Sequence, residues 1–123
     1  MKVKHNFKNL KVWQKAKSLA VKVYEVTADF PSEEKFGLIS QMRRSSVSIP
    51  SNIAEGSARN SSKAFSNVLD ISLGECFELE TQFIVANEIG ILNTENFELL
   101  QNKLDEIQKM IIGLKISIES NPY

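Results

Sequence analysis

Apolar residues recur along the chain in alternating steps of three and four. Over residues 9–29 they stand at Val12, Ala16, Leu19, Val23, Val26 and Phe30. The same spacing recurs over residues 61–89 and 94–118, and residues 32–55 carry a related pattern through Met42, Ile49 and Ile53. Steps of this size place side chains on one face of an α-helix. The pattern therefore predicts four amphipathic helices over these ranges.

Short polar or helix-breaking segments separate the predicted helices. Asn9 and Ser32 are the expected N-caps of the first and second helices, and Asn93 or Thr94 is the expected N-cap of the fourth. Pro50 lies inside the second helix and predicts a bend, and Gly56 marks the end of that helix. Because short connections make consecutive helices antiparallel neighbours, we expect an all-α fold. The expected architecture is an antiparallel up-down-up-down four-helix bundle that forms a single domain over residues 1–123.

Three of the predicted helices carry more apolar residues than one core-facing stripe requires. A second stripe is typical of another contact surface, so we expect a homo-oligomer. The candidate interface residues are Leu10, Trp13, Ala20, Tyr24, Leu73, Phe77, Ile112 and Ile116. The alternative is a monomer in which the other three helices cover a central first helix. Gly74 and Gly113 each cost about 1 kcal/mol relative to Ala inside a helix, and a close backbone approach would explain them.

The net charge is zero, but the charges are unevenly distributed along the chain. Residues 1–63 hold 12 basic and 5 acidic side chains, and residues 64–123 hold 3 basic and 10 acidic ones. This asymmetry indicates either a surface for a polyanion or two halves that attract each other. The candidate nucleic-acid-binding residues are Lys8, Lys11, Lys15, Lys22, Arg43, Arg44, Arg59 and Lys63. The four lysines form a narrow stripe on the first helix, which a solvated surface would also explain.

The sequence lacks the residues that most enzymes and metal sites need. His5 is the single histidine and Cys76 the single cysteine, which excludes a di-iron centre and a zinc site of the usual composition. No base is available to activate a serine, and no glycine-rich phosphate loop occurs. We therefore expect no catalytic residue, metal, cofactor or small-molecule substrate. Cys76 lies on an apolar seam, which favours a core thiol.

The low cysteine content also bears on the compartment. One cysteine fits a reducing compartment, and the sequence shows no signal peptide. No apolar run approaches the roughly 18 residues of a membrane span. We therefore expect a cytoplasmic protein that does not insert into a membrane.

Two segments resemble a known family. The stretch QMRRSSVSIPSNIAEGSARNSS, residues 41–62, and the stretch FKNLKVWQKAKSLAVKVYEVTADFP, residues 7–31, are similar to the bacterial four-helix bundle proteins. These are also called 23S ribosomal RNA intervening-sequence proteins. The resemblance covers nearly the whole chain. In the first stretch, Arg43, Arg44, Asn52, Glu55 and Arg59 match polar positions of the family.

The resemblance implies a non-enzymatic bundle that assembles into a homopentamer. Some members are encoded within insertions in 23S rRNA genes, which suggests an RNA-linked or ribosome-linked role. A related branch, the accessory variability determinant of diversity-generating retroelements, binds nucleic acid and a reverse transcriptase. Our main hypothesis is a homo-oligomer that associates with RNA or a ribonucleoprotein. The alternative is a scaffold or accessory subunit that binds a partner protein such as a reverse transcriptase.

Overall fold

Four long α-helices account for most of the chain in the computed structural model, which describes residues 6–122. The described helices are α1 (Lys11–Thr27), α2 (Leu38–Ser57), α3 (Ser62–Glu88) and α4 (Thr94–Ser120). Two short 3-10 helices, η1 (Phe7–Asn9) and η2 (Ser32–Glu34), precede α1 and α2. No residue between 6 and 122 lies in a strand.

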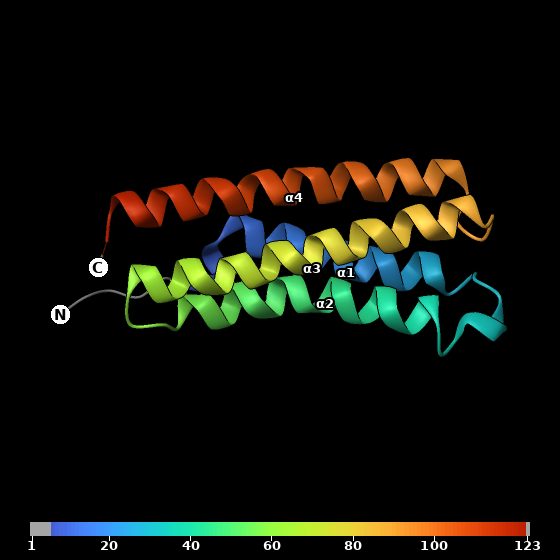
Figure 1. Cartoon of the computed structure of the whole chain (residues 1–123), viewed down its shortest axis with the longest axis horizontal. Coiled ribbons are helices and arrows are strands. Elements are labelled where there is room, and N and C mark those ends of the chain that lie inside the picture. The colour runs from blue at the N-terminus through green and yellow to red at the C-terminus, as the bar shows by residue number, and fades with distance from the viewer. Residues whose placement is uncertain (1–5, 123) are drawn as a thin grey trace.

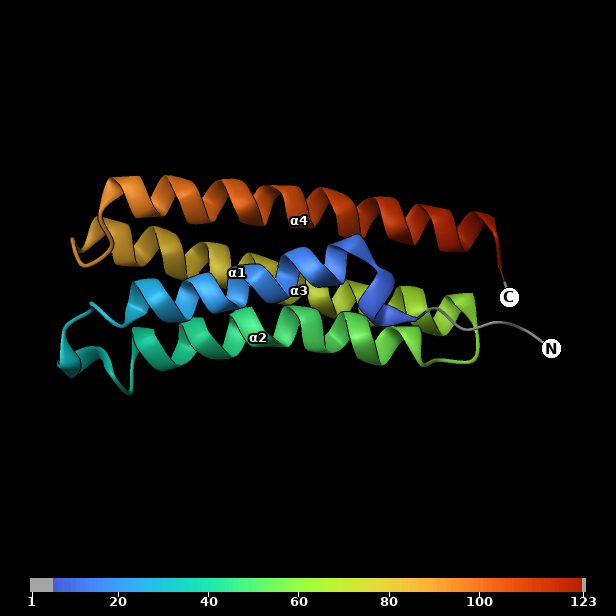
Figure 2. The ribbon, with the colours of Figure 1, turned by 180° about the vertical axis from the view of Figure 1, so that it is seen from behind.

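The four helices alternate in direction along one long axis (Figure 1). Helix α1 packs against α2 and α4, and α3 packs against the same two helices, so α1 and α3 lie at opposite corners of the bundle. The view from behind shows α1 in front of α3, between α2 and α4 (Figure 2). The predicted all-α four-helix bundle is confirmed. The alternative of a central first helix is wrong, because α1 has only two helical neighbours among the described elements.

The predicted apolar seams form the core. All six seam positions of the first helix are buried, from Val12 to Phe30. Cys76 lies on the buried seam of α3 together with Phe65 and Phe83. The periodicity predicted these positions correctly, because an apolar stripe on each helix can leave water only by facing the other three.

Helices α2 and α3 approach each other especially closely. A Cβ atom added at Gly56 would lie 2.8 Å from Cδ1 of Phe65, whose ring is fully buried. Farther along the same pair of helices, the Ser72 hydroxyl of α3 donates a hydrogen bond of 3.1 Å to the carbonyl oxygen of Ile49 in α2. Gly56 therefore lies within the last turn of α2, where it permits this contact, and the helix ends at Ser57. Helix α2 also stays helical through Pro50.

The predicted starts of the first two helices are wrong. Leu10 is extended, so residues up to Asn9 form η1, and the side chain that accepts a capping hydrogen bond there belongs to Asn6. Ser32 opens η2 instead of α2. Gly37, with φ of −109° and ψ of −114°, breaks the helical path, and the Glu34 carboxylate accepts from the backbone N–H of Leu38.

The caps of the last two helices follow their local sequence. Ser61 accepts a hydrogen bond from the N–H of Ala64, and Asn93 accepts one from the N–H of Asn96. Gly90 has a φ of 87°, which suits the residue just after a helix C-terminus. A side chain three residues before its partner can cap a helix without any tertiary contact, so the predicted cap at Asn93 is confirmed. The cap at Ser61 follows the same local rule, although the sequence analysis did not name it.

Candidate nucleic-acid interface

The lysine stripe of α1 borders a groove between α1 and α4, which we call the basic groove. Lys15, Ser18 and Lys22 from α1 and Lys103 from α4 line two adjoining cavities of about 370 and 290 Å³. Lys11 is exposed one turn before Lys15 on the same stripe. Lys103 was missed by the sequence reasoning, because only the packing of α4 against α1 brings it to this edge.

Two acidic side chains partly neutralise the basic groove. Lys15 Nζ lies 2.5 Å from the Glu106 carboxylate, and this hydrogen bond holds the pKa of Glu106 below its usual value. Lys22 Nζ lies 3.5 Å from Glu25. Lys11 and Lys103 have no ion pair within residues 6–122. The groove therefore keeps a net positive charge.

Arg43 holds α1 and α2 together instead of facing the basic groove. Its Nε donates a hydrogen bond of 2.9 Å to Thr27 Oγ1, and a terminal nitrogen donates one of 3.3 Å to the carbonyl oxygen of Tyr24. The guanidinium also lies 4.5 Å from the centroid of the Tyr24 ring. Both partners lie in the last turn of α1, where the Tyr24 carbonyl oxygen also accepts from the backbone N–H of Ala28. The structure thus gives Arg43 a folding role.

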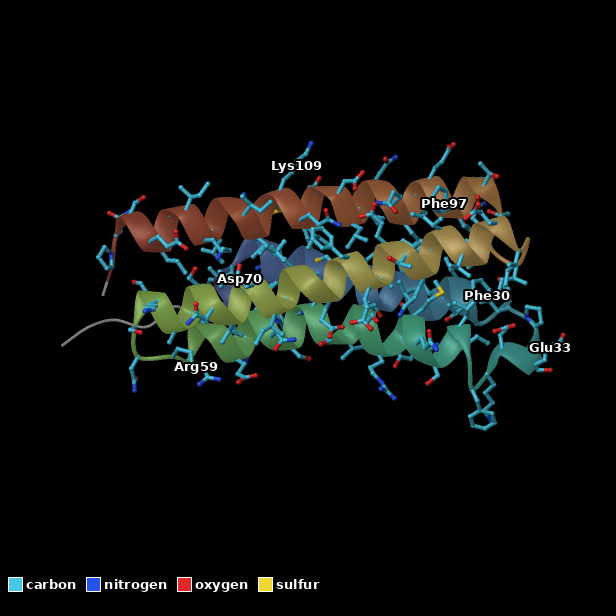
Figure 3. All side chains as sticks on the ribbon, in the orientation of Figure 1. Phe30, Glu33, Arg59, Asp70, Phe97 and Lys109 are labelled. Atoms are coloured by element: carbon cyan, nitrogen blue, oxygen red, sulfur yellow. The ribbon has the colours of Figure 1, made fainter. Side chains whose placement is uncertain are left out.

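The four remaining predicted cations do not line the basic groove. Lys8 is exposed in η1, with its Nζ 5.9 Å from the centroid of the Phe7 ring. Arg44 is exposed beside a cavity between α2 and α3. Arg59 forms an ion pair of 2.5 Å with Glu55 and projects from the end of α2, as Figure 3 shows. Lys63 borders a cavity near the start of α3 together with Glu119. The structure therefore does not gather all eight predicted cations on one face.

The predicted interface residues divide between two faces. On the first, between α1 and α2, Ala20, Val21, Tyr24, Val47 and Pro50 line a shallow cavity of about 320 Å³. Val21, Tyr24 and Val47 are exposed there, whereas Ala20 is buried. Two further predicted residues, Leu10 and Trp13, are half-buried against the core. The Trp13 ring also packs edge-on against Phe7.

The second face lies along α3 and α4. Phe77 and Ile116 are each 60% exposed, Ile112 is 48% exposed, and Leu73 is half-buried. Lys115 of α4 forms an ion pair of 2.7 Å with Asp70, which lies between the two helices in Figure 3. A Cβ atom added at Gly74 of α3 or at Gly113 of α4 would meet no atom within 4 Å. The packing within the bundle therefore does not require either glycine, and the close backbone approach expected there is absent among the described residues.

Other candidate chemistry is sparse among the described residues. Between residues 6 and 122, no group of three His, Cys, Asp or Glu side chains could hold a metal ion. His5, the single histidine of the sequence, lies outside this range. Burial raises the pKa of the Cys76 thiol to about 12, so it is not a thiolate near neutral pH. Within the described range, no helix is long and apolar enough to cross a membrane.

Comparisons with known proteins place this bundle among relatives. The model of the 23S rRNA-intervening sequence protein family matches residues 8–113. A solved structure from Bacteroides thetaiotaomicron, described as a protein of unknown function from the S23 ribosomal protein family, is similar with a TM-score of 0.76. The two sequences are 28% identical, and the match covers 85% of this chain and 97% of the Bacteroides protein chain. No curated protein matches the chain.

Proposed function

The chain belongs to the 23S rRNA-intervening sequence protein family, and from this premise we propose that it is a non-catalytic, cytoplasmic homo-oligomer that binds RNA through its basic groove. The single observation that carries the RNA proposal is the groove itself. Lys15, Lys22 and Lys103, from two helices, line two adjoining cavities that share Lys103. Lysine ammonium groups bind phosphate as point charges, which suits contact with a nucleic-acid backbone without sequence readout.

The distribution of charge over the helices also supports RNA binding on the α1 side of the bundle. Helix α1 carries four lysines and one glutamate, whereas α3, at the opposite corner, carries one lysine and five acidic residues. The phosphate backbone of a polyanion is therefore attracted more strongly to the α1 side than to the α3 side. The zero net charge of the whole chain does not prevent binding, because exposed charges more than about 10 Å away are largely screened at 0.1 M salt.

Salt dependence tests the RNA proposal. The probe is a fluorescently labelled oligouridine of about 12 nucleotides, and the readout is anisotropy. If the groove contacts four phosphates, affinity should fall roughly 50-fold between about 50 and 200 mM salt.

Replacing both Lys11 and Lys15 by Glu should weaken binding at least about tenfold and flatten the salt response. Lys35→Glu combined with Lys109→Glu, at two exposed lysines outside the groove, is the control matched in charge. Salt-independent binding, or equal affinity in the groove variant and the control, would reject the proposal.

Two exposed apolar faces support the proposed self-association. The face between α1 and α2 carries Val21, Tyr24 and Val47, and the face along α3 and α4 carries Phe77 and Ile116. Exposed aromatic and aliphatic side chains that cluster on a rigid surface are typical of protein interfaces. Assembly would also place several basic grooves in one particle, so that weak contacts with RNA add up through avidity.

Sedimentation of the purified protein separates self-association from the scaffold alternative. The proposal expects a species several times heavier than 13.9 kDa at micromolar concentration. Phe77→Ser with Ile116→Ser should shift this species toward the monomer while leaving the melting temperature of the bundle nearly unchanged, because both side chains are exposed. If the parent protein sediments only as a monomer, the apolar faces are left for a different protein, and the scaffold function is favoured instead.

A further inference from the structure

A polar cavity of about 250 Å³ lies between α2 and α3, on the side of the bundle away from the basic groove. Its wall includes Ser40, Arg44 and Ser45 from α2 and Glu78 and Gln82 from α3. Phe36, in the turn before α2, stands at its edge and is 88% exposed. The volume is below the roughly 300–1,000 Å³ of pockets for drug-sized ligands, so it suits a small group such as one nucleic-acid base.

An unsatisfied amide lies in the wall of this cavity. Gln82 is only 9% exposed, and its Oε1 accepts no hydrogen bond from any described residue. A buried acceptor without a donor is rare, because it has given up its hydrogen bonds to water. The terminal torsion of glutamine is soft, so a small rotation of the amide can turn this oxygen toward the cavity. A ligand that donates an N–H would satisfy it.

The charges of the wall select the chemistry of that ligand. Arg44 offers a fork of N–H donors, and Glu78 offers a carboxylate that only accepts. A phosphate would be attracted by the first and repelled by the second. A neutral planar group with acceptors on one edge and donors on the other can satisfy both. Guanine has this pattern: arginine pairs with its O6 and N7, and a carboxylate can accept its N1–H and N2–H.

We propose that the cavity between α2 and α3 binds a guanine base, with Arg44 on the O6/N7 edge, Glu78 on the N1/N2 edge and Phe36 stacked on the base. Gln82 Oε1 accepts the one remaining N–H of the amino group. Exposed aromatic side chains are the usual stacking partners of unpaired bases. The base has two sources, a free guanine nucleoside or an unpaired guanine in RNA. The second source rests on the RNA binding proposed above.

Nucleosides test the cavity directly. In protein labelled with ¹⁵N, guanosine should shift the side-chain signals of Gln82 and Arg44 with a Kd on the order of 1 mM, as expected for a ligand of this size. Adenosine presents an acceptor where guanine has N1–H, and uridine has no amino group, so both should bind at least about fivefold more weakly. Glu78→Gln and Arg44→Lys should each weaken guanosine binding by a similar factor. Both residues are exposed, so the fold should persist, and Glu88→Gln on the same helix is the matched control.

Oligonucleotides then separate the two sources. Oligouridine with one central guanine should bind more tightly than oligouridine. Glu78→Gln should remove this preference and leave the affinity for plain oligouridine nearly unchanged, because Glu78 lies far from the basic groove. Guanosine binding without any RNA binding would support the cavity with a free nucleoside and reject the proposed RNA function. RNA binding without guanine preference, together with no selective guanosine shift, would overturn the cavity and leave the RNA function in place. Equal guanosine affinity in Glu78→Gln and its control would also overturn it.

Discussion

Alanine substitutions at two helical glycines should change the stability of the bundle in opposite directions. In Gly56→Ala, the new Cβ would stand 2.8 Å from Cδ1 of Phe65 and 3.3 Å from Cβ of Val68. In Gly113→Ala, the new Cβ would meet no atom within 4 Å. Both glycines lie inside α-helices, so both substitutions gain the same helix propensity. The pair therefore isolates the cost of the contact between α2 and α3.

The expected magnitudes follow from these distances. Replacing glycine by alanine in a helix stabilises it by about 1 kcal/mol, and Gly113→Ala should show this full gain. At Gly56 the Phe65 ring is fully buried and cannot move into solvent, so overpacking should cost about 2–3 kcal/mol. The net effect of Gly56→Ala is then a loss of about 1–2 kcal/mol. The two variants should differ by roughly 2–3 kcal/mol in unfolding free energy.

Urea unfolding followed by circular dichroism measures this difference. The midpoint should rise for Gly113→Ala and fall for Gly56→Ala, with the slope unchanged if the extent of unfolding is the same. Gly74→Ala, which also has open space around it, repeats the stabilising arm on α3. If Gly56→Ala proved as stable as Gly113→Ala, the close packing of α2 on α3 and the role assigned to Gly56 would both be refuted.

Three further predictions concern single side chains. Arg43→Lys should lower the free energy of unfolding in urea by about 1–2 kcal/mol, because the variant loses the fork of hydrogen bonds at the end of α1. Arg44→Lys should change that free energy by less than about 0.5 kcal/mol. Equal losses in the two variants would contradict the different roles of these arginines. Cys76 should resist a thiol reagent in the folded protein near pH 7 and react once urea unfolds it, since burial raises its pKa to about 12; rapid native labelling would show that the thiol is not buried. Glu75→Gln should raise the melting temperature near pH 7, because burial and then the neighbouring Glu78 raise the pKa of the Glu75 carboxyl in the folded state. That gain should vanish as the pH falls below the unfolded value of 4.5, where the carboxyl is protonated in both states, and a gain independent of pH would contradict this cause.

The adjacent arginines show where sequence reasoning stops. Arg43 and Arg44 have the same chemistry and were both expected to bind phosphate. A rotation of 100° about the helix separates neighbouring residues, so one guanidinium meets the end of α1 and the other borders the cavity beside α3. Their roles depend on which helix packs on each side of α2, and the spacing of apolar residues within α2 does not encode that choice.

The amino-acid sequence by itself determined the number of helices, their apolar seams and the caps at Ser61 and Asn93. These features depend on side chains within a few residues of one another, and the hydrophobic effect needs only one apolar stripe per helix. The tertiary structure alone decided that Gly56 accommodates Phe65, that Lys103 joins the lysines of α1, and that a polar cavity forms beside Gln82. Each of these joins residues on different helices, so their relation arises only when the packing sets the register and rotation of one helix against the next.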